Sequence, residues 1–443
     1  MMKIIYSRFI IVILCALLIA PAALSTAGAA EKPGTKIKVY ESALNISRLF
    51  DTEEINCAVK YLSETDEAAL KIIEEKTAGG GAAYEVILTL GRGLQEMFKP
   101  LTPAESDFLV KNFNYSALRQ SVKLIAAAAK FLSYKGKTAA AGRALFAACM
   151  MSIHFESAAE AARDSELSPL VTKMVSIACQ KICFETLIVN VLECESAGNY
   201  FSNFYKTLEY INKSQFSIQK TLGNERSNIE KIIRLYASLD AEKVKELKEG
   251  AIYPPEVYSI LAAEIKKSPF AMKVARLYTD EAIAQVSEIF SKYGEAAKLP
   301  FKDAFKALEE ADKKLTSGGY NNFFTMVSIP NFNRANTMIA RNHAFLAMAQ
   351  TAALLKLYKN ANKKFPDALS ACAAAPAGLK LPKDPFTQED FKYVKLPHGG
   401  FILISAGANM LIDGKYEGGF DPKDFRLGSS DDIVMTENSI TSK

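Results

Sequence analysis

The sequence predicts a predominantly α-helical α+β protein: an irregular helical array, then one long helix and a small antiparallel sheet. Apolar residues recur at steps of three and four from Asp51 onward, which is the spacing of amphipathic helices. Breaks rich in Gly, Pro and Ser divide this pattern into segments of about 12–30 residues, a length that suits helices. The stretch LPKDPFTQEDFKYVKLPHGGFILISAGAN (381–409) is different, because it alternates apolar and polar residues between Pro and Gly turns, as strands do.

The first thirty residues have the three parts of a secretory signal peptide. Lys3 and Arg8 make the start of the chain positive, an apolar run follows from Phe9 to Leu24, and small residues precede Glu31. We expect cleavage after Ala29 or Ala30, which makes the protein exported, periplasmic or extracellular. The alternative is an uncleaved segment that anchors the chain in the membrane at the cell envelope.

Composition argues against two classes of partner, nucleic acid and anionic membranes. Of the 443 residues, 49% are hydrophobic and 23% are charged, which is an ordinary globular balance. Loss of Lys3 and Arg8 with the signal would lower the net charge from +5 to +3. A charge so close to neutral does not favour nucleic acid or an anionic membrane surface as a partner.

Residues 31–330 are expected to form the helical body. LRQSVKLIAAAAKFLSYKGKTAAAGRALFAACMMSIHFES (118–157) reads as two helices joined at Gly136, with alanines where they press together, as in tetratricopeptide-like hairpins. Helical arrays of this kind usually offer a surface for protein partners. The segment LSPLVTKMVSIACQKICFETL (167–187) resembles the midsection of a group of large exported bacterial proteins, a resemblance that implies no activity.

No catalytic residue is predicted. His154, His343 and His398 belong to no metal-binding or hydrolase motif, and we expect structural roles for them. Cys179 and Cys183 lie one helical turn apart in an apolar context, which favours burial over metal binding or redox chemistry. The six cysteines outside the signal leave room for one or two disulfides, with no pairing indicated.

Residues 331–435 are expected to form a C-terminal module, followed by a disordered tail at 436–443. A long amphipathic helix ends before Pro366, and basic residues crowd its last turns. DFKYVKL and GFILISA are then two strands on either side of a turn at Pro397–Gly400. FILI is apolar on both faces, as expected of a strand covered on both sides.

The order of these pieces resembles the major pseudopilin of type II secretion. The matching positions are Phe365-Pro366, Leu381-Pro382, Asp384-Pro385, Tyr393, Ser405, Gly407 and Asp432-Ile433. The resemblance covers about a quarter of the chain and implies a helix laid on a short sheet, with a calcium-binding loop. This chain departs from the family in its ordinary signal peptide and its large inserted body, which argues against polymerisation into a pseudopilus.

The resemblance implies a structural calcium ion in the loop at 409–433. Calcium takes hard oxygen ligands, and this loop is rich in carboxylates and glycine. The expected metal ligands are Asp413 and Asp432, assisted by Asn409, Asp431 and backbone carbonyls. The alternative is a solvated acidic loop without an ion.

Together these observations predict an exported, non-catalytic protein with a binding or assembly role at the cell envelope, exercised through its helical body. One alternative is an accessory component of a type II secretion or pilus-like system. The other is an exported hydrolase whose site is scattered through the helices and would be recognised by a pocket that gathers a histidine with carboxylates.

Overall fold

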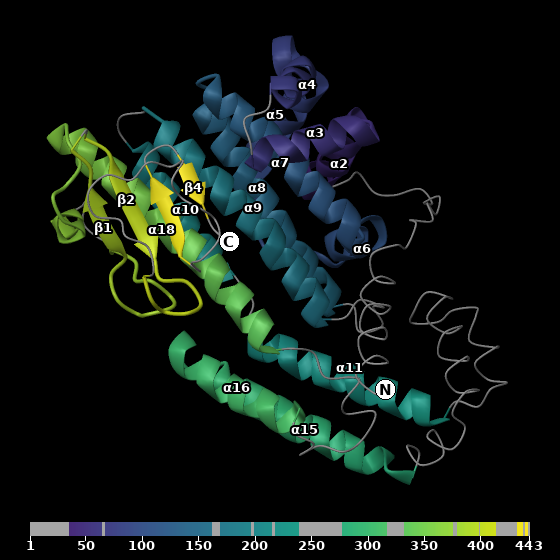
Figure 1. Ribbon diagram of the computed structural model, residues 1–443. Coiled ribbons are helices and arrows are strands. Elements are labelled where there is room, and N and C mark those ends of the chain that lie inside the picture. The colour runs from purple at the N-terminus through teal and green to yellow at the C-terminus, as the bar shows by residue number, and fades with distance from the viewer. Residues whose placement is uncertain are drawn as a thin grey trace.

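The computed structural model describes residues 35–63, 67–161, 169–195, 199–214, 218–238, 277–316, 332–374, 379–397, 399–412, 432–436 and 439–441. Within these residues, helices follow one another up to Asn362 and the chain then forms an antiparallel sheet (Figure 1). The predicted class, a predominantly α-helical α+β protein with a small antiparallel sheet, is confirmed. The expected signal peptide at 1–30 lies outside the described residues.

The helices before the C-terminal module surround two long central ones. These two are α8 (Thr138–Ala161) and α9 (Pro169–Glu193), which are buried along most of their length. The preceding helices are α2 (Thr35–Ile46), α3 (Thr52–Ser63), α4 (Glu67–Thr77), α5 (Ala82–Met97), α6 (Pro103–Asn112) and α7 (Tyr115–Tyr134), with 3₁₀ turns η1 (Ser47–Leu49) and η2 (Ala78–Gly80). The following ones are α10 (Tyr200–Ser214), α11 (Ile218–Ser238), α15 (Thr279–Ala296) and α16 (Phe301–Thr316).

The predicted hairpin at 118–157 is present as α7 and α8. Gly136 turns the chain between them with a φ of 76°, a conformation that costs glycine little. The amides of Gly136 and Lys137 donate to the carbonyls of Ser133 and Leu132, which satisfies the end of α7. The alanines in the middle of each helix are buried, Ala126–Ala129 on α7 and Ala141, Ala144, Ala147 and Ala148 on α8, so the two backbones can approach closely across this interface.

Helix α9 is the most apolar element of the core. Among the described residues, α9 is the one helix whose length and composition would allow it to cross a membrane. Of its most apolar 18-residue stretch, 67% is buried inside the protein. It packs against α7, α8 and α18, which explains this burial. Cys179 and Cys183 are fully buried on it, as expected.

Helices α11, α15 and α16 form a second, smaller cluster. Val286, Phe290 and Tyr293 of α15 pack with Ile233 of α11 and with Phe332 at the start of α18. The rings of Tyr293 and Phe332 stack with centroids 4.8 Å apart. This group lies below the main helical layers in Figure 1.

The long predicted helix is α18 (Phe332–Asn362), and it joins the C-terminal module to the body. It packs against α9 and α10, and its buried apolar residues from Ala340 to Leu355 belong to the same core as those of α2, α5, α7 and α8. It ends at Asn362, where Lys363 takes a φ of 60°, a few residues before Pro366. The η3 turn (Leu369–Ala374) follows.

Four strands form the sheet in the order β1-β2-β3-β4: β1 (Lys392–Lys395), β2 (Phe401–Ser405), β3 (Ile433–Thr436) and β4 (Ser439–Thr441). All neighbours are antiparallel, and Tyr393 lies opposite Leu403, which confirms the predicted pairing of the first two strands. Every residue of β2 is buried. Phe401 and Leu403 join the main core, whereas Ile402 and Ile404 form a small cluster on the other face with Val434.

The end of the chain differs from the expectation of a disordered tail at 436–443. Thr436 is the last residue of β3, and Ser439–Thr441 form β4, which pairs with it. The short polar sequence of this segment carries little strand signal by itself. The open edge of β3 provides the hydrogen-bonding partner that makes it a strand.

Candidate functional site

Of the four residues predicted to bind calcium, the structure describes Asn409 and Asp432. Asp413 and Asp431 lie outside the described residues. Asn409 is exposed after β2, and its Oδ1 accepts a hydrogen bond from the amide of Leu411 at 3.0 Å. Asp432 is buried immediately before β3, with an exposed fraction of 1%. Among the described residues, no group of three or more His, Cys, Asp or Glu side chains is arranged to hold a metal ion.

Asp432 lies near a second buried carboxylate, that of Asp384. Asp384 Oδ1 accepts hydrogen bonds from the Phe386 amide and from Ser405 Oγ, each at 3.0 Å, and Oδ2 accepts one from the Ala406 amide at 2.9 Å. Burial raises the pKa of Asp384, and the charge of Asp432 raises it further. Two carboxylates in one buried place repel each other, and a proton or a cation relieves that repulsion.

Of the described histidines, His154 is buried and His343 is half-buried. His154 Nδ1 is 2.8 Å from Tyr40 Oη, and its ring also hydrogen-bonds to the backbone of Met97. A neutral ring that donates to this carbonyl accepts the Tyr40 proton at Nδ1. Burial lowers the pKa of both His154 and His343 to about 4. His398 lies outside the described residues.

Ion pairs and polar side chains cross the centre of the helical body. Lys173 Nζ lies 2.8 Å from Glu156 Oε1, and both side chains are almost fully buried. Burial raises the pKa of Glu156, and the neighbouring Lys173 opposes that change. Gln180 of α9 accepts a hydrogen bond from Asn342 Nδ2 of α18 at 2.9 Å. These contacts fix how α8, α9 and α18 pack, since a misplaced helix would leave buried polar groups without partners.

The cysteines of the described chain are all free thiols. Cys149, Cys179, Cys183, Cys194 and Cys372 are buried, and Cys57 is half-buried. Burial raises the pKa of Cys149, Cys179 and Cys183. A buried thiol with a raised pKa is a poor nucleophile and a poor metal ligand, so these side chains act as small apolar core residues.

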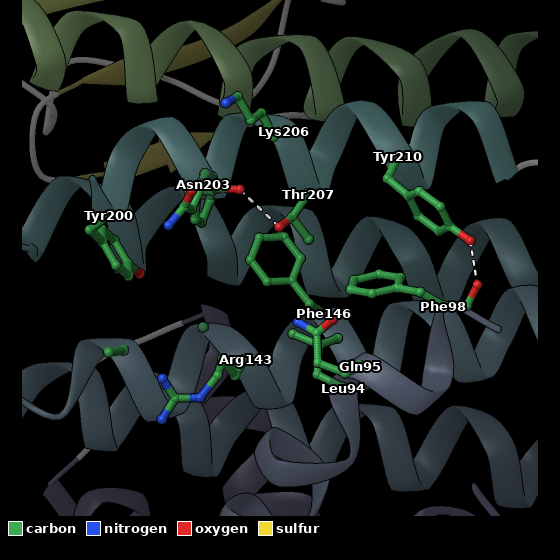
Figure 2. A pocket seen from close by; sticks show the side chains of 13 residues that line it. Leu94, Gln95, Phe98, Arg143, Phe146, Tyr200, Asn203, Lys206, Thr207 and Tyr210 are labelled. Carbon is green, nitrogen blue, oxygen red and sulfur yellow. Dashed lines mark hydrogen bonds between the residues drawn. The ribbon is translucent and has the colours of Figure 1, made fainter.

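An open groove of about 580 Å³ lies between α10 on one side and α5 and α8 on the other (Figure 2). Helix α10 packs its other side against α18, and few of its residues touch α8, so space remains on the α5 side. The groove is lined by Leu94, Gln95, Phe98, Ala139, Gly142, Arg143, Phe146, Tyr200, Asn203, Phe204, Lys206, Thr207 and Tyr210. Its volume is within the range of ligand-binding pockets.

A tyrosine lies near each end of this groove, as Figure 2 shows. Tyr210 Oη donates to the carbonyl of Phe98, and the two rings meet edge to face with centroids 4.7 Å apart. At the other end, Tyr200 Oη donates to Asn190 Oδ1 at 2.7 Å. Gly142 makes room for that contact, because a Cβ there would lie 3.0 Å from the tyrosine oxygen.

The floor of the groove is aromatic and its rim is polar. Phe146 and Phe204 meet edge to face at 5.1 Å beneath the opening. Gln95, Asn203, Lys206 and Arg143 are exposed at the rim. Among the described residues that line the groove there are two cations and no carboxylate.

No sequence motif indicates the groove. Its residues come from three helices that are far apart in the chain, and none of them forms a motif. One signal was present in α10, where Phe201, Phe204, Tyr205 and Leu208 are buried and Asn203, Lys206 and Tyr210 face outward. That pattern identifies an apolar face and a polar face, but it does not reveal which neighbouring helix leaves a gap.

Comparisons with protein-family models, with curated proteins and with solved structures find no match to this chain.

Proposed function

We propose that the chain is an exported, non-catalytic binding protein that engages a protein partner at the cell envelope through the groove between α5, α8 and α10. The observation that carries this proposal is the groove itself, with its aromatic floor and its exposed cationic and amide rim. Aromatic side chains with a polar rim are typical of protein recognition surfaces. Export is supported by the sequence of residues 1–30.

The chemistry of the described side chains supports a binding role over a hydrolytic one. His154 is committed to Tyr40 and to the Met97 backbone, and neither it nor His343 lines the groove. The polar residues that do line it are amides, hydroxyls and cations. Such a set can hold a ligand, but it lacks a pairing of nucleophile and base.

Photo-crosslinking in the cells that produce the protein tests this proposal. A photoreactive residue at Asn203, exposed in the groove, is expected to give an adduct with one recurring envelope or secreted protein. The same residue at Lys71, exposed on α4, is the matched control and is expected to give no such adduct. Adducts at both positions alike, or at neither, would contradict the proposal, as would recovery of the chain in the cytosol.

A role as an accessory of a type II secretion or pilus-like system is the second candidate. It is supported by the antiparallel pairing of β1 with β2, whose Phe401 and Leu403 share an apolar core with α18, and by the hydrogen bond from Ser405 to Asp384. Asp384 and Ser405 are two of the positions that carry the pseudopilin resemblance. The adduct partner distinguishes the candidates, because a pseudopilin captured from Asn203 favours this role and an unrelated protein rejects it.

We also propose that a structural calcium ion binds near Asp432, with Asp413, Asp431 and Asn409 as further ligands. The support is the burial of Asp432 beside Asp384, since a cation would relieve the repulsion between two buried carboxylates. Calcium is expected to raise the melting temperature of the full chain, and a chelator is expected to reverse the rise. A melting temperature that is the same in calcium and in chelator would reject the ion.

A further inference from the structure

We infer that the groove between α5, α8 and α10 recognises an acidic, apolar peptide segment, in which a carboxylate side chain stands next to an aromatic or aliphatic one. This inference rests on the proposed function, because it names the chemistry of the partner that the groove would bind. Three features of the groove lead to it: its hydrogen-bond donors, its charge and its floor.

Each hydroxyl group that lines the groove donates its hydrogen bond to another group of the protein. Tyr200 donates to Asn190, Tyr210 donates to the Phe98 carbonyl, and Thr207 donates to the Asn203 carbonyl at 2.8 Å. These three oxygens therefore present lone pairs to a ligand. The donors at the exposed rim of the groove are instead the side chains of Arg143 and Lys206 and the amides of Gln95 and Asn203. A ligand that satisfies them needs strong acceptors, and carboxylates supply these.

The charge of the groove is one-sided. Arg143 and Lys206 make no ion pair with a described carboxylate, whereas two acidic residues of α5 and α10, Glu96 and Glu209, are paired with other lysines. Glu96 pairs with Lys99 at 2.7 Å, and Glu209 pairs with Lys213 at 3.1 Å. An anionic ligand would therefore meet two cations without competition from a neighbouring acid. A bidentate contact between a guanidinium and a carboxylate is among the stronger polar contacts in proteins.

Arg143 is placed by its neighbours. The position of a Cβ on Gly91 would be 3.4 Å from Arg143 Cβ and 3.7 Å from Arg143 Nε, so the arginine lies along α5 where that helix has no side chain. Burial raises the pKa of Tyr200, and the positive charge of the nearby Arg143 opposes that rise. Figure 2 shows Arg143 extending from α8 at the end of the groove where Tyr200 lies, as an exposed cation of the rim.

The floor supplies the apolar half of the recognition. Phe146 and Phe204 form its centre, and Leu94 and Phe98 continue it along α5. An aromatic or aliphatic side chain between two carboxylates could cover this floor while the carboxylates reach the rim. A ligand that is only acidic would leave the floor wet, and one that is only apolar would leave the cations and amides without acceptors.

Fluorescence anisotropy with the full chain tests this inference. The probe is a fluorescein-labelled peptide Gly-Asp-Phe-Glu-Phe-Gly, and its matched control is Gly-Asn-Phe-Gln-Phe-Gly, which has the same shape without charge. We expect the acidic probe to bind at least tenfold more tightly. Arg143→Glu is expected to weaken it at least tenfold, whereas Lys71→Glu, at an exposed site on α4, is expected to leave it unchanged.

The outcomes separate the two claims. Equal affinity for the acidic and amide probes, or equal affinity of the Arg143→Glu and Lys71→Glu proteins for the acidic probe, overturns the inference. If the probe fails to bind but the adduct at Asn203 persists, the ligand chemistry is wrong and the binding function stands. If neither the bound probe nor the adduct is seen, both the ligand chemistry and the binding function are wrong.

A double variant provides a second check. Arg143→Glu/Lys206→Glu is expected to prefer the peptide Gly-Lys-Phe-Lys-Phe-Gly over the acidic probe, and a retained preference for the acidic probe counts against the inference.

Discussion

Ser405, at the end of β2, donates a hydrogen bond of 3.0 Å to Asp384 Oδ1, and the amide of the next residue donates to the other carboxylate oxygen. The Asp384 carboxylate thereby connects the turn at Asp384-Pro385-Phe386 to β2, an inner strand of the sheet. Its third bond, from the Phe386 amide, holds the turn in place, and Phe386 packs against Phe301 of α16 at 4.8 Å. The contact couples the C-terminal sheet to the helical body.

Replacement of Asp384 is therefore expected to destabilise the sheet. Asp384→Ala leaves the buried amides of Phe386 and Ala406 without acceptors, which should lower the free energy of unfolding by about 3 kcal/mol. The control is Asp390→Ala, which removes an exposed ion pair with Lys383 and should cost less than about 1 kcal/mol. Urea unfolding measures both, and equal effects would show that the Asp384 contacts contribute little.

The buried pair of Lys173 and Glu156 gives a second prediction. Lys173→Met leaves the Glu156 carboxylate buried without its cation, and we expect a loss of about 3–5 kcal/mol in the free energy of unfolding. Lys173→Met/Glu156→Leu removes both charges and should recover most of that loss. Urea unfolding of the two variants checks this, and a double variant as unstable as the single one would contradict it.

Stability should also depend on pH through His154. Its pKa is about 4 in the folded protein and about 6.5 when unfolded. The unfolded chain therefore takes up the proton first as the pH falls, and stability is lost from about pH 6.5 down to about pH 4. Glu156 and Glu185, whose pKa values burial raises, change stability in the opposite direction. The quantity to measure is thus the difference between the wild type and a His154→Gln variant.

We expect that difference in unfolding free energy to shift by about 3 kcal/mol between pH 7 and pH 4, as the wild type loses its advantage. Urea unfolding at several pH values provides the measurement. Parallel curves for the two proteins across this range would mean that His154 is not held neutral in the fold.

Gly142 offers a test of how the groove is built. Gly142→Ala places a Cβ 3.0 Å from Tyr200 Oη and 3.2 Å from Asn190 Oδ1, and Asn190 is itself held by Ser133 and Thr138. We expect a loss of about 1–2 kcal/mol in stability and weaker crosslinking at Asn203. Gly223→Ala, on α11 with nothing near its Cβ position, should instead gain up to about 1 kcal/mol. A matching gain at Gly142 would show that Tyr200 moves freely.

The sequence predicted those parts of the fold that depend on local pattern. Gly136 indicated the turn between α7 and α8, and the alternation around Tyr393 and Leu403 indicated the strands that pair there. The β4 strand was missed because its polar residues pair only when β3 offers an edge. The burial of Lys173 was also missed, since its partner Glu156 lies on a different helix.

The candidate site was hidden for a related reason. Helical periodicity shows which face of α10 is apolar, but the groove exists because α10 packs on α18 and leaves the α5 side open. That depends on how three helices meet, and no single segment records it. The expected metal ligands Asp413 and Asp431 lie outside the described residues, so the calcium site stays a prediction.

The central claim is that the groove itself binds the partner, and filling it gives the most direct test. Ala139 is exposed in the groove, so Ala139→Trp should occupy the space with little effect on the melting temperature. The measurement is the yield of the Asn203 adduct in cells, with Ala104→Trp, exposed on α6, as the control. The account predicts that Ala139→Trp abolishes the adduct and Ala104→Trp preserves it. A folded Ala139→Trp protein that crosslinks as well as the wild type would contradict the account.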